Sequence, residues 1–107
     1  VVGVKVGKQT KAYDWNRLVR DTVIIDVVDN QPLAVVLSAD ENSFVVLGLH
    51  KKNSTVQLKN NGIVIDGEPY SFLGKSLKEG QNDLKPIMAF QEYWHSWKTF
   101  NPETSQY

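Results

Sequence analysis

The stretch that decides the fold runs from residue 55 to residue 72 and reads TVQLKNNGIVIDGEPYSF. Apolar and polar residues alternate over 55–58, which is the period of a strand with one buried face. Asn61-Gly62 predicts a tight hairpin, because a type I′ turn needs positive φ at both central residues. The chain returns through Ile63-Val64-Ile65, and Asp66-Gly67 turns it again. Short strands joined by such turns predict an antiparallel meander.

The same pattern extends toward the N-terminus. The valines at positions 2, 4 and 6 alternate with other residues, and Thr22–Val28 is rich in β-branched residues. Leu33–Leu37 is apolar on both faces, which is typical of a strand buried on both sides. Asp14 can cap a short helical turn through Leu18 and Val19. We therefore predict an α+β fold made mainly of an antiparallel β meander or a small barrel-like sheet.

The C-terminal region has a helical period instead. At about 100° per residue, its apolar residues fall on one arc of roughly 140°: Ile87, Phe90, Tyr93, Trp94, Trp97 and Phe100. Pro86 suits the first position of a helix, and Asn101-Pro102 would end it. The pattern predicts one C-terminal amphipathic helix whose aromatic face covers the sheet.

The composition of the chain excludes several classes of function. The chain has 107 residues, which we interpret as a single domain over 1–107. Its formal net charge is zero, so we expect no nucleic-acid partner. No apolar run approaches the ~20 residues that span a bilayer, so we expect no membrane span. Cysteine is absent, which excludes disulfides and thiol nucleophiles.

The N-terminus begins directly with a strand-like sequence and has no initiator Met. We therefore expect a processed or trimmed chain from which an upstream segment such as a signal peptide is missing. This predicts an extracytoplasmic protein, either periplasmic, secreted or tethered to a membrane.

Both ends of the chain carry motifs of a known family. The stretches similar to the family's motifs are VGVKV at 2–6, KAY at 11–13, VIIDVV at 23–28, QPLAVV at 31–36, YSFLGKS at 70–76 and YWHSWKTFNPETSQY at 93–107. The chain thereby resembles the bacterial family catalogued as domain of unknown function 3179. The resemblance implies a shared fold and supplies no activity. Leu37-Ser38-Ala39-Asp40 stands where the family carries a cysteine-containing stretch, so the chain resembles a divergent, shortened member.

Asp26 interrupts the apolar stretch 23–28. Strand alternation puts its side chain on the face that carries Ile24 and Val28. A lone carboxylate among valines costs several kcal/mol if it is buried without partners. Asp26 therefore lies either on a solvent face or in a hydrogen-bonded network near a functional site.

The chain contains two histidines, His50 and His95. His95 lies on the polar side of the predicted helix, either as an exposed surface residue or as a base or ligand in a cleft. Neither HxxxH nor HxH spacing is present, so the sequence predicts no metal site. Leu73-Gly74-Lys75-Ser76 resembles the end of a phosphate-binding loop, but the first glycine of that motif is absent. We therefore expect no nucleotide and no other cofactor.

Aromatic residues outside the predicted helix are the candidates for ligand binding. Trp15, Tyr13 and Tyr70 either stack on a sugar ring or a partner protein, or form the rim of the core. We interpret the chain as a non-catalytic module that binds a small ligand, a glycan or a protein. The alternative is a hydrolase-like or metal-assisted enzyme that uses Asp26, His50 or His95. A monomer and a homodimer through an edge strand such as Val2–Val6 both remain open.

Overall fold

A computed structural model describes residues 1–41, 43–59, 62–87, 89–91 and 104–106. Strands dominate this part of the chain, and one short helix accompanies them. The elements are β1 (Val2–Val6), β2 (Gln9–Tyr13), α1 (Trp15–Asp21), β3 (Val23–Val28), β4 (Gln31–Leu37), β5 (Phe44–Gly48), β6 (Val56–Lys59), β7 (Gly62–Ile65), β8 (Glu68–Ser71), β9 (Lys85–Pro86), β10 (Ala89–Gln91) and β11 (Ser105–Gln106).

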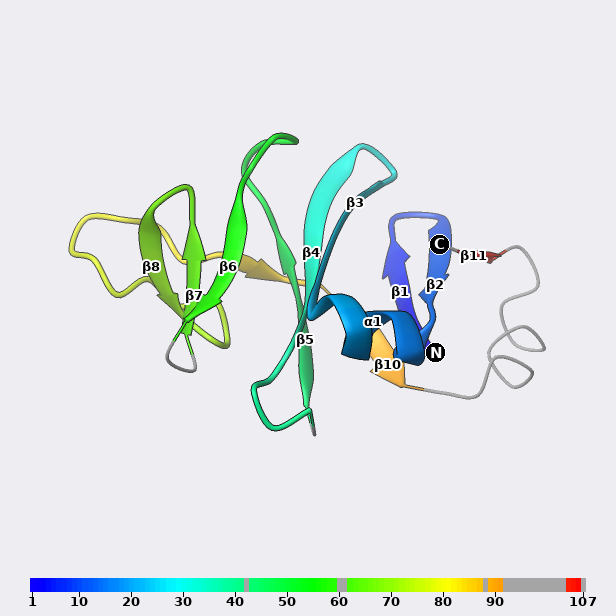
Figure 1. Ribbon diagram of the computed structural model, residues 1–107. Helices are drawn as coiled ribbons and strands as arrows, with labels where there is room; N and C mark the ends of the chain where they lie inside the picture. Colours follow the sequence, from blue (N-terminus) through cyan, green and yellow to red (C-terminus); the bar gives the residue numbers. More distant parts are fainter. Residues whose placement is uncertain (42, 60–61, 88, 92–103, 107) are drawn as a thin grey trace.

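The strands form three sheets. Sheet A has the order β10-β1-β2-β11, sheet B has the order β3-β4-β5-β9, and sheet C has the order β6-β7-β8. All pairs of neighbouring strands are antiparallel except β11 and β2, which are parallel. Sheet B stands between the other two (Figure 1). The antiparallel meander is confirmed, whereas the barrel-like closure is wrong, because the described strands form separate sheets with open edges.

Strand β4 lies at the centre of the fold, and both of its faces are buried. Leu33, Val35 and Leu37 pack into one cluster, whereas Ala34 and Val36 pack into another. All five are at most 1% exposed. Burying one of the leucine or valine side chains among them contributes about 1.5–3 kcal/mol. A layer of structure on each side of sheet B thus explains why Leu33–Leu37 is apolar on both faces.

Two apolar cores result, one on each side of sheet B. The first lies toward sheet A and α1 and contains Val2, Val4, Tyr13, Leu18, Ile24, Val28, Leu33, Val35, Leu37 and Val46. The second lies toward sheet C and contains Ala34, Val36, Leu47, Leu49, Ile63, Ile65, Tyr70 and Leu84.

The predicted C-terminal amphipathic helix is wrong where the structure describes that region. Residues 85–86 form β9 and residues 89–91 form β10. Residue 88 and residues 92–103 of the predicted helix lie outside the described residues. The described residues contain one helix, α1, and it lies near the N-terminus.

The physical reason for this difference is strand pairing. An edge strand has a row of unpaired N–H and C=O groups. β10 covers one side of β1, and β9 covers one side of β5. Pro86 fits the outer edge of sheet B, where no ladder N–H is needed. Phe90, which the helical period places on the buried face, is 51% exposed.

Two N-terminal expectations are also corrected. Val2–Val6 is no edge strand, because β10 and β2 pair with its two sides. A homodimer through strand pairing would therefore need another edge. Helix α1 begins after Asp14, which occupies the N-cap position but makes no side-chain capping hydrogen bond. Burial of Leu18 in the first core holds the helix instead.

Sheet C follows the expected meander. β6 and β7 pair from Val56↔Ile65 to Lys59↔Gly62. Asn61 of the predicted Asn61-Gly62 turn lies outside the described residues. Asp66 and Gly67 both have positive φ, 51° and 83°, and they join β7 to β8 as the sequence predicts.

Asp66 also makes the stability of sheet C depend on pH. The backbone N–H of Thr55 donates to Asp66 Oδ1 at 2.9 Å, and this bond holds the pKa of Asp66 below its ordinary value of 3.8. A group with a lowered folded pKa stabilises the fold above its unfolded pKa, and the contribution is lost as the pH falls through the folded pKa. We expect Asp66→Asn to lose this dependence, measured as Tm between about pH 5 and pH 2.

Glu79→Gln is the control for this prediction. Among the described residues, the exposed Glu79 side chain has no hydrogen bond or ion pair. Its Tm profile should follow that of the unchanged chain. Parallel profiles for Asp66→Asn and the unchanged chain would contradict the prediction.

Candidate functional site

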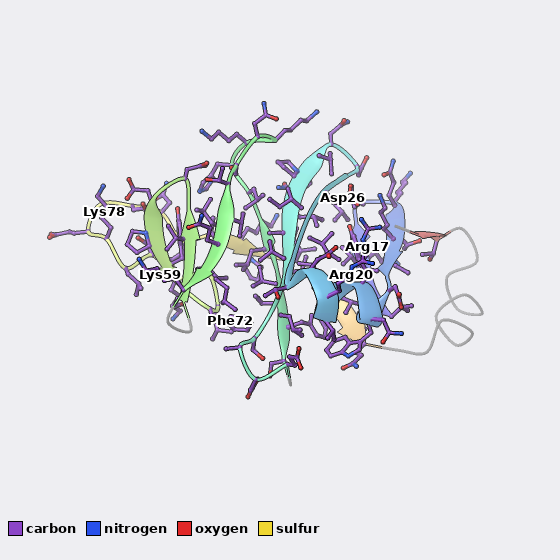
Figure 2. The ribbon with its side chains drawn as sticks, in the orientation of Figure 1. Arg17, Arg20, Asp26, Lys59, Phe72 and Lys78 are labelled. Carbon is purple, nitrogen blue, oxygen red and sulfur yellow. The ribbon has the colours of Figure 1, made fainter. Side chains whose placement is uncertain are left out.

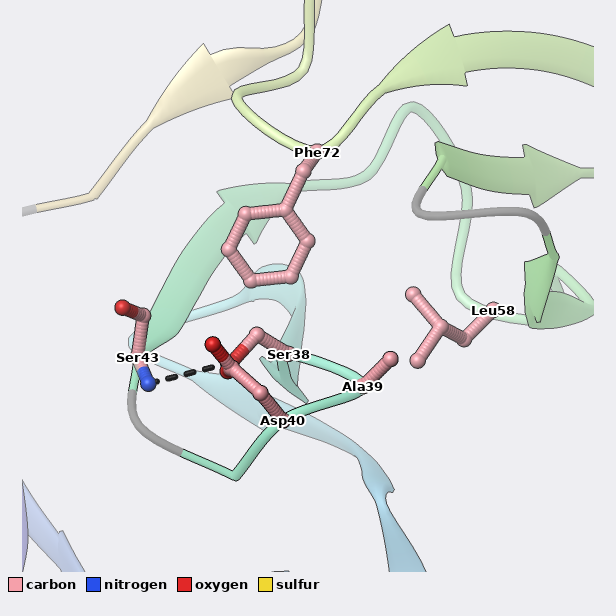
Figure 3. A pocket seen from close by; sticks show the side chains of 6 residues that line it. All are labelled: Ser38, Ala39, Asp40, Ser43, Leu58 and Phe72. Carbon is pink, nitrogen blue, oxygen red and sulfur yellow. Dashed lines mark hydrogen bonds between the residues drawn. The ribbon is translucent and has the colours of Figure 1, made fainter.

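A pocket of about 480 Å³ opens between sheet B and sheet C. Ser38, Ala39, Asp40 and Ser43 line it from the connection between β4 and β5 (Figure 3). The opposite wall is apolar and comes from β6 and the segment after β8. The volume lies within the range of roughly 300–1,000 Å³ that small-molecule sites occupy.

Ser38 organises the polar wall. Its backbone N–H donates to the Ser43 carbonyl at 2.8 Å, and the Ser43 N–H donates to Ser38 Oγ at 3.0 Å. The Ser38 hydroxyl in turn donates to Asp40 Oδ1 at 2.5 Å. The Glu41 N–H donates to the Ser38 carbonyl at 2.9 Å. These four bonds fix the loop, so the carboxylate and the hydroxyl are held in place before any ligand arrives.

The apolar wall consists of Phe72 and Leu58. Both side chains are half-buried and pack against the second core. Phe72 directly follows β8, and the turn after it is closed by the Ser71 N–H donating to the Lys75 carbonyl at 2.8 Å. In Figure 3 the Phe72 ring extends toward Ser38 and Asp40 on the facing loop. An aromatic ring and a carboxylate therefore face the same space.

Asp26 takes part in a separate polar cluster between sheets A and B (Figure 2). Tyr13 Oη donates to Asp26 Oδ2 at 3.0 Å, and Lys11 Nζ lies 2.6 Å from the same oxygen. The Val27 N–H donates to Asp26 Oδ1 at 2.8 Å. Ile24 and Val28 are buried on the same face of β3, as strand alternation predicts. The carboxylate thus joins β3 to β2 across the first core.

The three aromatic candidates lie in or against the two apolar cores. Tyr13 is fully buried in the first core, and Trp15 packs against that core with its ring 6.3 Å from the ring of Phe44. Tyr70 is buried in the second core, where burial raises the pKa of its hydroxyl. These three side chains do not converge on the pocket.

Of the two histidines, His50 lies in the described part of the chain, and it does not line the pocket. His50 is exposed after β5, and its ring makes no hydrogen bond or ion pair within the described part of the chain. His95 lies outside the described residues. Within the described ranges, no three His, Asp or Glu side chains are grouped so that they could hold a metal ion.

Sequence reasoning missed the residues that line the pocket. Ser38, Asp40, Leu58 and Phe72 come from three segments that only the packing of sheets B and C brings together. One signal does coincide with the site. Leu37-Ser38-Ala39-Asp40 stands where the resembled family carries its cysteine-containing stretch, and three of these four residues line the pocket.

Comparison with known proteins gives a family but no function. A family model described as Protein of unknown function (DUF3179) matches residues 1–104, which confirms the resemblance of the sequence motifs. No curated protein and no solved structure matches the chain. No helix among the described residues is long and apolar enough to cross a membrane.

Proposed function

Because the chain belongs to the family described as Protein of unknown function (DUF3179), its role has to be inferred from its own site. We propose that it is a non-catalytic module that binds a small ligand in the pocket between sheets B and C. The observation that carries this proposal is the facing pair of walls, one with hydroxyl and carboxylate groups and one with an aromatic ring. Ligand sites commonly combine an apolar lining with a few fixed polar groups.

The hydrogen bonds within the β4–β5 loop favour a binding site over a catalytic site. The Ser38 hydroxyl already donates to Asp40 and accepts from the Ser43 N–H. A nucleophilic serine needs an adjacent general base that is itself oriented by a third group. Among the described pocket residues the carboxylate of Asp40 is the one titratable group, so this set of partners is incomplete.

The alternative is a hydrolase-like or metal-assisted enzyme that uses Asp26 or a histidine. Asp26 accepts a hydrogen bond from the buried Tyr13 and pairs with Lys11. It makes no hydrogen bond or ion pair with a histidine among the described residues. This arrangement favours a structural role for Asp26 and gives the enzyme less support than the binding module.

Replacing the aromatic wall tests the proposal. A thermal-shift panel should include sugars, nucleotides and small amines, each at about 100 times its dissociation constant where this is reachable. Bound ligand then adds about 2.7 kcal/mol, which raises Tm by several degrees in a domain of this size. We expect Phe72→Ala to weaken binding at least tenfold, because it removes the ring that covers the ligand.

Phe90→Ala is the matched control, because Phe90 is exposed on β10 in sheet A, outside the pocket. Each shift is compared with the Tm of the same variant without ligand, and Phe72→Leu keeps part of the packing if Phe72→Ala unfolds. Equal ligand shifts in the Phe72 and Phe90 variants would refute the proposed site. A panel without any shift would refute small-ligand binding.

A further inference from the structure

We propose that a second pocket, at the junction of sheets A and B, binds a phosphate group, either as the free ion or as the end group of a small molecule. This inference goes beyond the proposed function and is independent of it, because the two pockets share no described lining residue. The second pocket has a volume of about 190 Å³. Its described lining consists of Lys5, Val6, Gly7, Gln31, Lys85, Pro86 and Ile87.

The second pocket lies where the pairing of β1 with β10 ends. The last described pair of this ladder is Val4↔Ala89. Beyond it the two segments diverge, because β9 pairs with β5 in sheet B and the Ile87 N–H donates to the Val46 carbonyl at 2.9 Å. β9 therefore belongs to sheet B, whereas β10 belongs to sheet A (Figure 1). The space between Lys5–Gly7 and the diverging segment forms the pocket.

Two lysines determine the charge of this pocket. Lys5 comes from β1 and Lys85 from β9, and the described lining contains no Asp or Glu. Neither ammonium group makes a hydrogen bond or an ion pair within the described part of the chain. Two like charges around one small pocket repel each other. A cleft lined by one sign of charge attracts ions of the opposite sign, so the pocket favours an anion.

The size and the donors of the pocket favour phosphate among anions. Its volume is below the roughly 300–1,000 Å³ of sites for larger molecules, so it suits a group of a few atoms. The Gln31 side-chain nitrogen donates to the Pro32 carbonyl at 2.6 Å and to the Leu49 carbonyl at 3.2 Å. In the described lining, the two lysines are therefore the side chains that can still donate to an anion. A phosphate monoester carries close to two negative charges at neutral pH, which matches two lysine point charges.

Asp29, in the turn between β3 and β4, is a carboxylate beside this pocket. A Cβ atom added at Gly7 would overlap Asp29 Oδ2, so this oxygen lies against the backbone of a lining residue. Among the described residues the Asp29 carboxylate makes no ion pair, so its charge opposes an anion in the pocket. We expect Asp29→Asn to strengthen phosphate binding about two- to threefold. Asparagine tolerates the positive φ of 48° at this position.

Methyl phosphate and dimethyl phosphate form a matched pair of probes, because the first carries nearly two negative charges and the second carries one. We expect methyl phosphate to bind about fivefold more tightly than dimethyl phosphate to the full chain, measured by NMR titration at constant ionic strength. Its binding should weaken as salt is raised, because salt screens the attraction of exposed charges.

Lys5→Met and Lys85→Met each remove one ammonium group and keep an apolar side chain of similar length. We expect each of them to weaken the binding of methyl phosphate about fivefold. Lys8→Met is the matched control, because the exposed Lys8 follows Gly7 in the same turn but lies outside the described lining. We expect it to change the affinity by at most about twofold.

Inorganic phosphate separates the two sources of the ligand. At a pH at which both probes are dianions, tighter binding of inorganic phosphate supports the free ion, and tighter binding of methyl phosphate supports the end group of a larger molecule. Equal binding of methyl phosphate and dimethyl phosphate would overturn the proposal, and so would equal losses in Lys8→Met and the two pocket variants. Absence of binding by both phosphates would overturn it as well. None of these outcomes affects the ligand of the pocket between sheets B and C.

Discussion

Gly74→Ala is expected to lower the free energy of unfolding by about 3 kcal/mol, from left-handed backbone strain and overpacking together. Gly74 has a φ of +85°, which L side chains rarely adopt. A Cβ atom at this position would lie 2.7 Å from Leu47 Cδ2 and 3.2 Å from Leu84 Cβ. Both leucines belong to the second core, so the clash has little room to relax. Urea denaturation measures the loss.

Gly80→Ala separates the two causes. Gly80 has a similar φ of +80°, but a Cβ atom there would meet nothing within 4 Å. It should therefore show the backbone strain alone, about 1–2 kcal/mol. The difference between the two variants measures the contact of the turn with Leu47 and Leu84. Equal losses at Gly74 and Gly80 would contradict the close packing of sheet C on sheet B.

Asp26→Ala is expected to cost about 2–3 kcal/mol of stability, somewhat less than the roughly 3–5 kcal/mol that breaking a fully buried ion pair costs. The substitution leaves the hydroxyl of the fully buried Tyr13 and the ammonium of Lys11 without this carboxylate. The side chains of Lys11 and Asp26 are 21% and 16% exposed, so water compensates part of the loss. Urea denaturation at neutral pH measures it.

A double-mutant cycle with Tyr13→Phe shows whether the hydrogen bond itself contributes. We expect a coupling of about 1 kcal/mol between Tyr13 and Asp26. Asp21→Ala is the control, because its carboxylate pairs with Arg17 and Arg20 on the exposed side of α1, and we expect little change. An Asp26→Ala variant as stable as the unchanged chain would show that the contacts of Asp26 with Lys11 and Tyr13 do not stabilise the fold.

Local signals in the sequence predicted the parts of the fold that depend on neighbouring residues. The meander of β6, β7 and β8 follows from strand alternation and the turn at Asp66-Gly67. The burial of β4 on both faces follows from its unbroken apolar run. Alternation also placed Asp26 on the face with Ile24 and Val28.

Contacts between distant segments could not be predicted in the same way. The helical period over 87–100 is a local pattern, and pairing of β10 with β1 overrides it at Ala89–Gln91. The partners of Asp26 come from β2, across the first core. The pocket forms where sheet C packs against the β4–β5 loop. No single segment of sequence predicts that packing.

The claim that this pocket binds a small ligand is tested most directly by amide NMR of the full chain, titrated in parallel with choline and with glucose. We expect at least one probe to shift the amide signals of the pocket residues Ser38, Asp40, Ser43, Leu58 and Phe72, and we expect those of Lys11 and Asp26 to stay in place. Two titrations without shifts, or shifts centred on the Asp26 cluster, would contradict it.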